Sequence, residues 1–183
     1  RRGLAGNPSE SVFEMHRWQV MREARASWLR VNTPPTAGWL DADASPQYAV
    51  LAPWSGGHVI KYVAHRPVIW DNFGDDVGRE NFAAGRAYYN SRSEEEALSY
   101  LDGLRVHYVV AREDHARRSG SKNPRTMMSR LYEFDGSEAV LGGRARGAGE
   151  PQVHVEALEQ HRLVYMSVPL AGEPGKAKPY LKV

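Results

Sequence analysis

The sequence predicts a mixed α/β fold, in which helices flank a small, partly parallel sheet and antiparallel strands follow at the C-terminal end. Two observations favour this class. Short apolar runs alternate with helical patterns between Tyr48 and Val110, and such alternation is typical of parallel strands joined by helices. Two strand-like runs at 162–168 and 180–183 are joined by a segment rich in Gly, Pro and Lys, which is typical of a hairpin.

Length and composition fit one globular domain with room for a small appendage. The 183 residues are 42% apolar and 25% charged, as in ordinary globular proteins. A net charge of +2 is too small to indicate a nucleic-acid partner. Because there is no cysteine, disulfides, zinc–thiolate sites and thiol nucleophiles are excluded, and an oxidising compartment is tolerated.

The order of segments suggests three parts. Residues 1–10 are expected to be a flexible lead-in, residues 11–141 an α/β core domain, and residues 142–183 a mobile Gly/Arg-rich loop followed by β strands. No run of 18 apolar residues occurs, so we expect no membrane span. The chain opens on Arg1 rather than Met, and we therefore expect a fragment of a longer polypeptide.

A long helix is expected first. Ser11 and Glu14 form a capping box, which predicts a helix over about residues 12–31. Pro34 and Pro35 end it, since neither continues a helix. The helix has an apolar stripe at helical spacing, which predicts core packing or, as an alternative, docking on a further domain or a membrane surface: Met15, Trp18, Met21, Trp28 and Leu29.

The sheet elements follow. Residues 48–52 and 66–70 read as short strands, and residues 79–90 as a helix with Phe82 and Tyr89 facing inward. Apolar runs of this length between turn residues are typical of buried strands.

A second capping box and the strongest strand signal complete the core. Ser93 with Glu96 predicts the start of a helix that ends near Gly103. Residues 106–110 are the clearest strand, and residues 126–134 are expected to form a short helix.

The turn after the first strand is the leading candidate site. Gly56 and Gly57 follow a strand and precede a helical turn near His58, and paired glycines permit close backbone approach by a ligand such as a phosphate. The pattern is neither G-x-G-x-x-G nor a P-loop, so a plain tight turn is the favoured interpretation on physical grounds.

Several pieces in consistent order resemble the soluble C-terminal domain of oligosaccharyltransferase catalytic subunits. That family carries a Trp-Trp-Asp-Tyr-Gly signature, for which this chain has Pro53-Trp54-Ser55-Gly56-Gly57. The likeness also includes Trp28 to Pro34, His65 to Gly74, and the helix-then-strand segment 93–111, and it covers about residues 14–114.

The resemblance implies an acceptor-binding site. In the family, the signature pocket binds the hydroxyl of the Ser or Thr two positions after the acceptor Asn, through indole N–H groups and the aspartate. Here Pro53 replaces the first Trp, Ser55 the Asp and Gly56 the Tyr, while Trp54 and Gly57 match. The resemblance thus implies acceptor binding by Trp54, Ser55, Gly56 and Gly57, and a related transferase with another acceptor is an alternative.

A second family element is a helix with a Met-x-x-Ile motif beside the signature. Met128 and Leu131 resemble it, and the resemblance implies that both also contribute to acceptor binding. A core-facing Met/Leu pair on a short helix is the equally weighted alternative.

Other clusters give weaker predictions. Four acidic residues suit a hard cation but lack EF-hand spacing, so a solvated loop is favoured: Asp71, Asp75, Asp76 and Glu80. The histidine pairs His58/His65 and His154/His161 lack an H-E-x-x-H arrangement, and no serine triad can be assembled. Five basic residues would suit lipid head groups or a pyrophosphate, with a solvated loop as the default: Arg112, Arg117, Arg118, Lys122 and Arg125.

The resemblance implies a part in a polyprenol-dependent oligosaccharyltransferase. The catalytic carboxylates and a divalent metal, Mn or Mg, are expected in a membrane domain outside this chain, which itself would hold no catalytic residue and no cofactor. The expected partners are that N-terminal transmembrane domain, the acceptor polypeptide and a polyprenol-linked oligosaccharide, on the extracytoplasmic (periplasmic) side, with no nucleic acid. A non-catalytic extracytoplasmic interaction module is the alternative, and a free-standing α/β enzyme is the least favoured.

Overall fold

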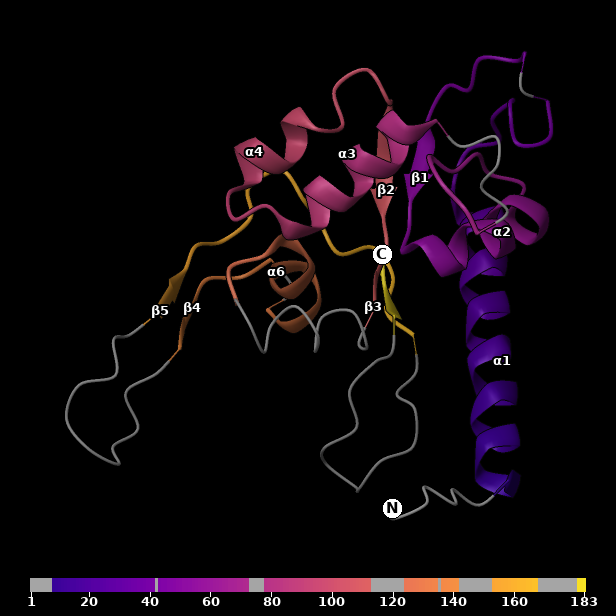
Figure 1. Ribbon diagram of the computed structural model, residues 1–183, viewed down its shortest axis with the longest axis horizontal. Coiled ribbons are helices and arrows are strands. Elements are labelled where there is room, and N and C mark those ends of the chain that lie inside the picture. Colours follow the sequence, from indigo (N-terminus) through magenta and orange to yellow (C-terminus); the bar gives the residue numbers. More distant parts are fainter. Residues whose placement is uncertain are drawn as a thin grey trace.

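The computed structural model describes residues 8–41, 43–72, 78–112, 124–134, 136–141, 153–167 and 181–183, with side chains for all of these except 8–18, 141 and 181–182. It confirms the mixed α/β class. Figure 1 shows the long helix α1 (Pro8–Asn32) and the short α2 (Gly57–Val59) on one side of the strand pair β1–β2, with helices α3 and α4 on the other. Within the described ranges, no helix has both the length and the apolar character needed to cross a bilayer.

Helix α1 begins earlier than its predicted cap. It starts at Pro8, so Ser11 lies inside the helix and the expected capping box is wrong; proline suits a first helical turn because its missing N–H has no partner there anyway. The end at Asn32 agrees with the prediction. Beyond it, the buried Arg66 guanidinium donates to the carbonyl oxygens of Arg30 at 3.0 Å and Thr33 at 2.7 Å, a favourable place for a cation because helix C-terminal carbonyls lack partners.

The central sheet is short. Strand β1 (Ala49–Leu51) pairs in parallel with β2 (Val106–Val109), as predicted. The expected strand at 66–70 makes only an isolated parallel bridge between Val50 and Val68. Pro67 has no N–H to donate, and only its carbonyl joins the ladder, accepting from the Val50 amide at 2.9 Å. The second strand prediction was therefore too long.

Alternation along β1 divides the interior into two cores. Ala49 and Leu51 face one apolar cluster, here called the α3 core, whose other members come mainly from the helices on that side. Val50 and Ala52 face the α1 core on the other side, with Met21 and Leu29 of α1. Because successive strand residues point to opposite faces, a strand buried on both sides must be apolar throughout, as this one is.

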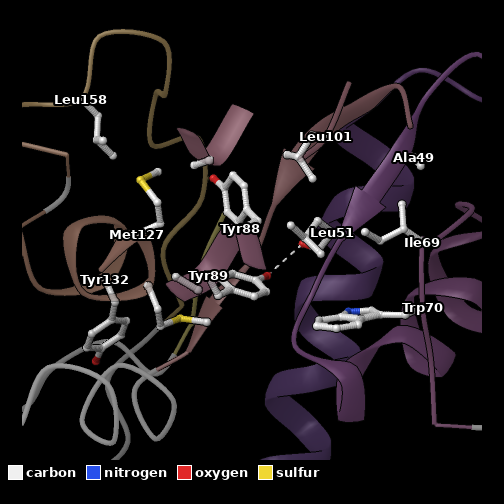
Figure 2. Packing of buried hydrophobic residues seen from close by; sticks show 13 residues of the cluster. Ala49, Leu51, Ile69, Trp70, Tyr88, Tyr89, Leu101, Met127, Tyr132 and Leu158 are labelled. Atoms are coloured by element: carbon white, nitrogen blue, oxygen red, sulfur yellow. Dashed lines mark hydrogen bonds between the residues drawn. The ribbon is translucent and has the colours of Figure 1, made fainter. Parts of the chain in front are cut away.

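The α3 core is built around aromatic residues. Helix α3 (Arg79–Asn90) has the predicted bounds, and Tyr89 is buried, whereas Phe82 is 42% exposed, so its expected inward position is wrong. Its ring lies over Trp70 with the ring centroids 5.0 Å apart, which places it at the margin of the core. Figure 2 shows Tyr88 and Tyr89 between Leu51 and Trp70 on one side and Met127 on the other.

The remaining elements close the fold. Helix α4 (Glu94–Ser99) is capped by Ser93, whose hydroxyl accepts the Glu96 amide, and helix α6 (Met127–Glu133) follows in the predicted place. The predicted antiparallel strands are confirmed in part: β3 (Ala111–Arg112) pairs with β6 (Leu181–Lys182), and β4 (Ala139–Leu141) with β5 (Val153–Val155). The described part of the predicted strand, residues 162–167, forms no continuous strand, but the amides of Val164 and Tyr165 donate to the Val183 carbonyl. Of the lead-in predicted at 1–10, residues 8–10 belong to α1, so that part of the prediction is wrong, while residues 1–7 and the loop at 142–150 lie outside the described residues.

Candidate functional site

The candidate turn lies directly at the carboxyl end of β1. Trp54–Gly56 form a 3-10 turn, η1, which continues into α2 and then into the π-helix η2 (Ile60–Ala64). In open α/β sheets, ligands favour the crevice beyond the carboxyl ends of parallel strands. The Trp54 side chain is 47% exposed, so the indole is presented to solvent at this edge rather than used in the core.

Gly57 is required by the chain itself. A Cβ atom at this position would lie 2.2 Å from the carbonyl oxygen of Trp70 and 2.8 Å from Asp71 Cβ. Both distances are far below van der Waals contact, so only glycine allows α2 to approach the 70–71 segment this closely. The Trp70 indole N–H in turn donates to the Ala52 carbonyl. The glycine signal thus has a packing cause, which agrees with the tight-turn interpretation.

Two buried arginines line the inner side of the turn. Arg112 of β3 donates from Nη1 to Ser55 Oγ at 2.7 Å, and Arg25 of α1 donates from Nη2 to the Gly56 carbonyl at 3.4 Å. Arg112 is 3% exposed and Arg25 is fully buried. A hydroxyl has one proton and two lone pairs, so Ser55 keeps its proton and one lone pair for a further partner.

The pKa of the buried Tyr89 hydroxyl shows which charges lie near the turn. Its hydroxyl donates to the Val110 carbonyl at 2.8 Å. Burial raises its pKa well above the ordinary value, and Tyr88 adds to this, whereas Arg25 and Arg112 oppose it. The phenol therefore stays neutral, and the two guanidinium groups lower its pKa without offsetting the larger effect of burial.

Met128 and Leu131 lie on α6. Met128 is 2% exposed and belongs to the α3 core, and Leu131 packs against that core while half-buried. This favours the interpretation of the pair as core residues, while their part in acceptor binding stays a prediction. Helix α6 contacts β3, whose Arg112 holds Ser55, so the structure connects the methionine helix to the turn through one strand.

The other sequence candidates are dispersed. His65 stacks on Trp39 with the centroids 4.0 Å apart, and His154 binds Glu138 at 2.5 Å. Asp71 is buried and lies 4.0 Å from Lys61 Nζ. No three His, Asp or Glu side chains among the described residues are grouped as a metal site. Five members of the acidic and basic sets lie outside those residues: Asp75, Asp76, Arg117, Arg118 and Lys122.

Sequence reasoning missed one partly buried chain of polar contacts. Glu94 accepts from His161 Nδ1 at 2.5 Å, and His161 Nε2 lies 2.7 Å from the Tyr88 hydroxyl. Glu94 also accepts the backbone amides of Glu159 and Gln160. Burial raises the pKa of Glu94, but the hydrogen bond from His161 and those amides outweigh it, and the net pKa is lowered. Glu94 and His161 are 67 residues apart in the sequence, and no local sequence pattern indicates such a contact.

Comparisons with known proteins agree with this architecture. A family model described as the AglB core domain (AglB core-like) matches residues 18–116. The chain is 34% identical over 88 residues to dolichyl-phosphooligosaccharide-protein glycotransferase 2 of Archaeoglobus fulgidus, which is 48% of this chain and 14% of that protein.

A solved structure has the same fold. The C-terminal globular domain of an oligosaccharyltransferase from Archaeoglobus fulgidus superposes with a TM-score of 0.51 and 22% identity, over 66% of this chain and 90% of that domain. This chain therefore spans only a small part of the curated relative, although it covers most of the solved domain. The matched segment 18–116 makes up more than half of the chain and contains the whole turn at Trp54, and the chain belongs to the AglB core-like family.

Proposed function

We propose that this chain is the C-terminal part of a membrane oligosaccharyltransferase and that its turn at Trp54–Gly57 binds the acceptor polypeptide. The observation that carries the proposal is the half-exposed indole of Trp54, in the signature position, at the carboxyl end of β1. A protein of this kind transfers a lipid-linked glycan on the extracytoplasmic side. Its catalytic carboxylates and its divalent metal, Mn or Mg, would belong to a membrane domain outside this chain.

The chemistry of the turn suits a hydroxyl-bearing acceptor. The Trp54 indole N–H is a donor only, whereas the Ser55 hydroxyl can donate its proton and accept one further hydrogen bond. Because Arg112 already donates to Ser55, the serine is held in one orientation. A Thr or Ser hydroxyl would accept from Trp54 and exchange a hydrogen bond with Ser55. An Ala in its place would leave those groups unmatched, which costs about 1–3 kcal/mol.

The direct test is to titrate the 183-residue chain with peptides and to monitor binding through the indole N–H signals in NMR spectra. An Asn-x-Thr peptide should shift the Trp54 signal, and an Asn-x-Ala peptide should bind about tenfold more weakly, given the cost of unmatched polar groups. Trp54→Phe assigns the signal, and the Trp39 indole, which stacks on His65, serves as an internal control. Equal shifts for both peptides, or shifts confined to Trp39, would count against acceptor binding.

A second candidate is a non-catalytic extracytoplasmic interaction module. The observation that favours it is the neutral Ser55, already bonded to Arg112, where the family signature has a carboxylate. The two are separated in the whole membrane protein with Trp54→Ala. Acceptor binding requires a raised KM for peptide and slower transfer at subsaturating peptide, at unchanged protein level, whereas an interaction module leaves the KM for peptide unaffected. We expect the 183-residue chain alone to transfer no glycan.

A further inference from the structure

A polar cavity separate from the turn lies among α4, α6 and β5. Its volume is about 440 Å³, within the range of pockets that take small molecules, about 300–1,000 Å³. Figure 1 places the three elements in the same part of the molecule. Three arginines contribute to its lining, and none of the lining residues belongs to the turn: Arg92, Ser93, Glu96, Arg125, Arg130, His154, Val155 and Glu156.

Arg130 is the central feature of this cavity. It is 3% exposed, and its terminal nitrogens donate to the carbonyl oxygens of Glu156 at 2.8 Å, Ala157 at 3.1 Å and Arg92 at 3.4 Å. Its Nε is buried and has no hydrogen-bond partner among the described residues. Across the same part of the chain, no salt bridge includes Arg130. A buried charge with only carbonyl partners is costly unless an opposite charge compensates it.

The rest of the lining carries charges of both signs. Arg92 and Arg130 are accompanied by two glutamates, Glu96 and Glu156, and Arg125 donates from Nε to the His154 carbonyl at 3.2 Å. The Glu96 carboxylate is already engaged, since it accepts from the Arg92 amide at 3.2 Å and from the Tyr100 hydroxyl at 3.3 Å. Arg130 has no carboxylate partner in the part of the chain that the structure describes, and the side chain of Arg92 is exposed.

We propose that this cavity binds a phosphate-type oxyanion, with Arg130 at its base and Arg92 and Arg125 at its rim. Guanidinium groups match tetrahedral oxyanions through paired N–H donors. The volume exceeds what a bare ion needs, so the natural ligand is a phosphorylated molecule, either soluble or a lipid head group. The inference is independent of acceptor binding at Trp54.

Calorimetry of the 183-residue chain with sodium phosphate, against sodium chloride at matched ionic strength, tests the site. Saturable binding of phosphate is expected, and Arg92→Gln should weaken it about tenfold through loss of a charge-assisted hydrogen bond. Arg92 is chosen because its side chain is exposed, so we expect its replacement to leave the fold intact. Arg130→Gln should also remove the rise in melting temperature that phosphate gives the wild type.

Arg86→Gln is the matched control, because Arg86 is an exposed arginine on α3 outside the cavity. Flotation with phosphatidylcholine vesicles, with and without phosphatidic acid, identifies the source of the phosphate. Binding only to vesicles with phosphatidic acid, weakened by Arg92→Gln, would support the site and assign it to a lipid head group. Absence of binding to both phosphate and these vesicles, or equal weakening by Arg86→Gln, would overturn the proposal.

Discussion

Replacing Gly57 by alanine tests the central geometric claim about the turn. The residue has helical angles, with φ −60° and ψ −46°, so helix propensity alone would favour alanine by about 1 kcal/mol. The added Cβ, however, would lie 2.2 Å from the Trp70 carbonyl oxygen and 2.8 Å from Asp71 Cβ. Neither is the free end of a flexible side chain, so the backbone segments must separate.

The two effects have opposite signs, and the steric one is larger. Overpacking against backbone costs about 3 kcal/mol, the upper part of its usual range, and after the propensity gain a net loss of about 2 kcal/mol remains. For a domain of this size that corresponds to a fall in melting temperature of about 4–8 °C. Urea unfolding, monitored by tryptophan fluorescence, measures this loss of free energy. The slope of the free energy against urea concentration should be the same for the variant and the wild type.

Two other glycines serve as controls. Gly78→Ala should cost at most about 1 kcal/mol through poorer capping of α3, because Gly78 is the N-cap of that helix and nothing lies within 4 Å of the added Cβ. Gly56→Ala should cost less than Gly57→Ala, since its nearest neighbour is the far end of the Arg25 side chain at 3.3 Å. Wild-type stability in Gly57→Ala would refute the close approach of α2 to the 70–71 segment.

Three further substitutions have defined outcomes. The lowered pKa of Glu94 means that its carboxylate stabilises the fold above the unfolded pKa, and that this contribution is lost as the pH falls through the folded pKa. The difference in unfolding free energy between the wild type and Glu94→Gln should therefore shrink from about pH 7 to about pH 3. A difference that stays constant with pH, or an equal change for the exposed Glu95→Gln, would contradict this. Arg66→Met should lower the free energy of unfolding in urea by about 3 kcal/mol, because several buried carbonyls lose a charged donor. Arg66→Lys should restore only part of that free energy. Full recovery by lysine would show that charge alone matters. Tyr89→Phe should cost about 1 kcal/mol through its buried hydrogen bond to a backbone carbonyl at 2.8 Å, and no loss would place that hydroxyl in contact with water.

The elements predicted best are those whose signals are local. Residues 79–90 form a helix with the expected ends, and the Ser93 cap forms as its pattern requires, because capping depends on atoms three residues apart. The apolar run at 106–110 gave a strand for a similar reason. Ser11 misled because a proline three residues earlier begins the helix first.

The elements predicted worst depend on distant partners. Phe82 has the spacing of an inward residue, yet Trp70 already fills the space beneath it and leaves the phenyl ring at the margin. At the turn, sequence could identify Trp54 and Gly57 by resemblance. It could not identify Arg112 as the partner of Ser55, because 57 residues separate them and only the pairing of strands brings them together.

Helix α1 also has a mechanical consequence. Its C-terminal part is fastened to the globular body at two points, by Arg25 on the Gly56 carbonyl and by Arg66 on the carbonyls at its end, while its other end projects beyond α2 (Figure 1). A helix of 25 residues is a stiff rod of roughly 37 Å at 1.5 Å per residue. A tilt imposed at its far end would therefore act on the turn through the Arg25 contact with the Gly56 carbonyl, and on β1 through the packing of Met21 and Leu29 against Val50.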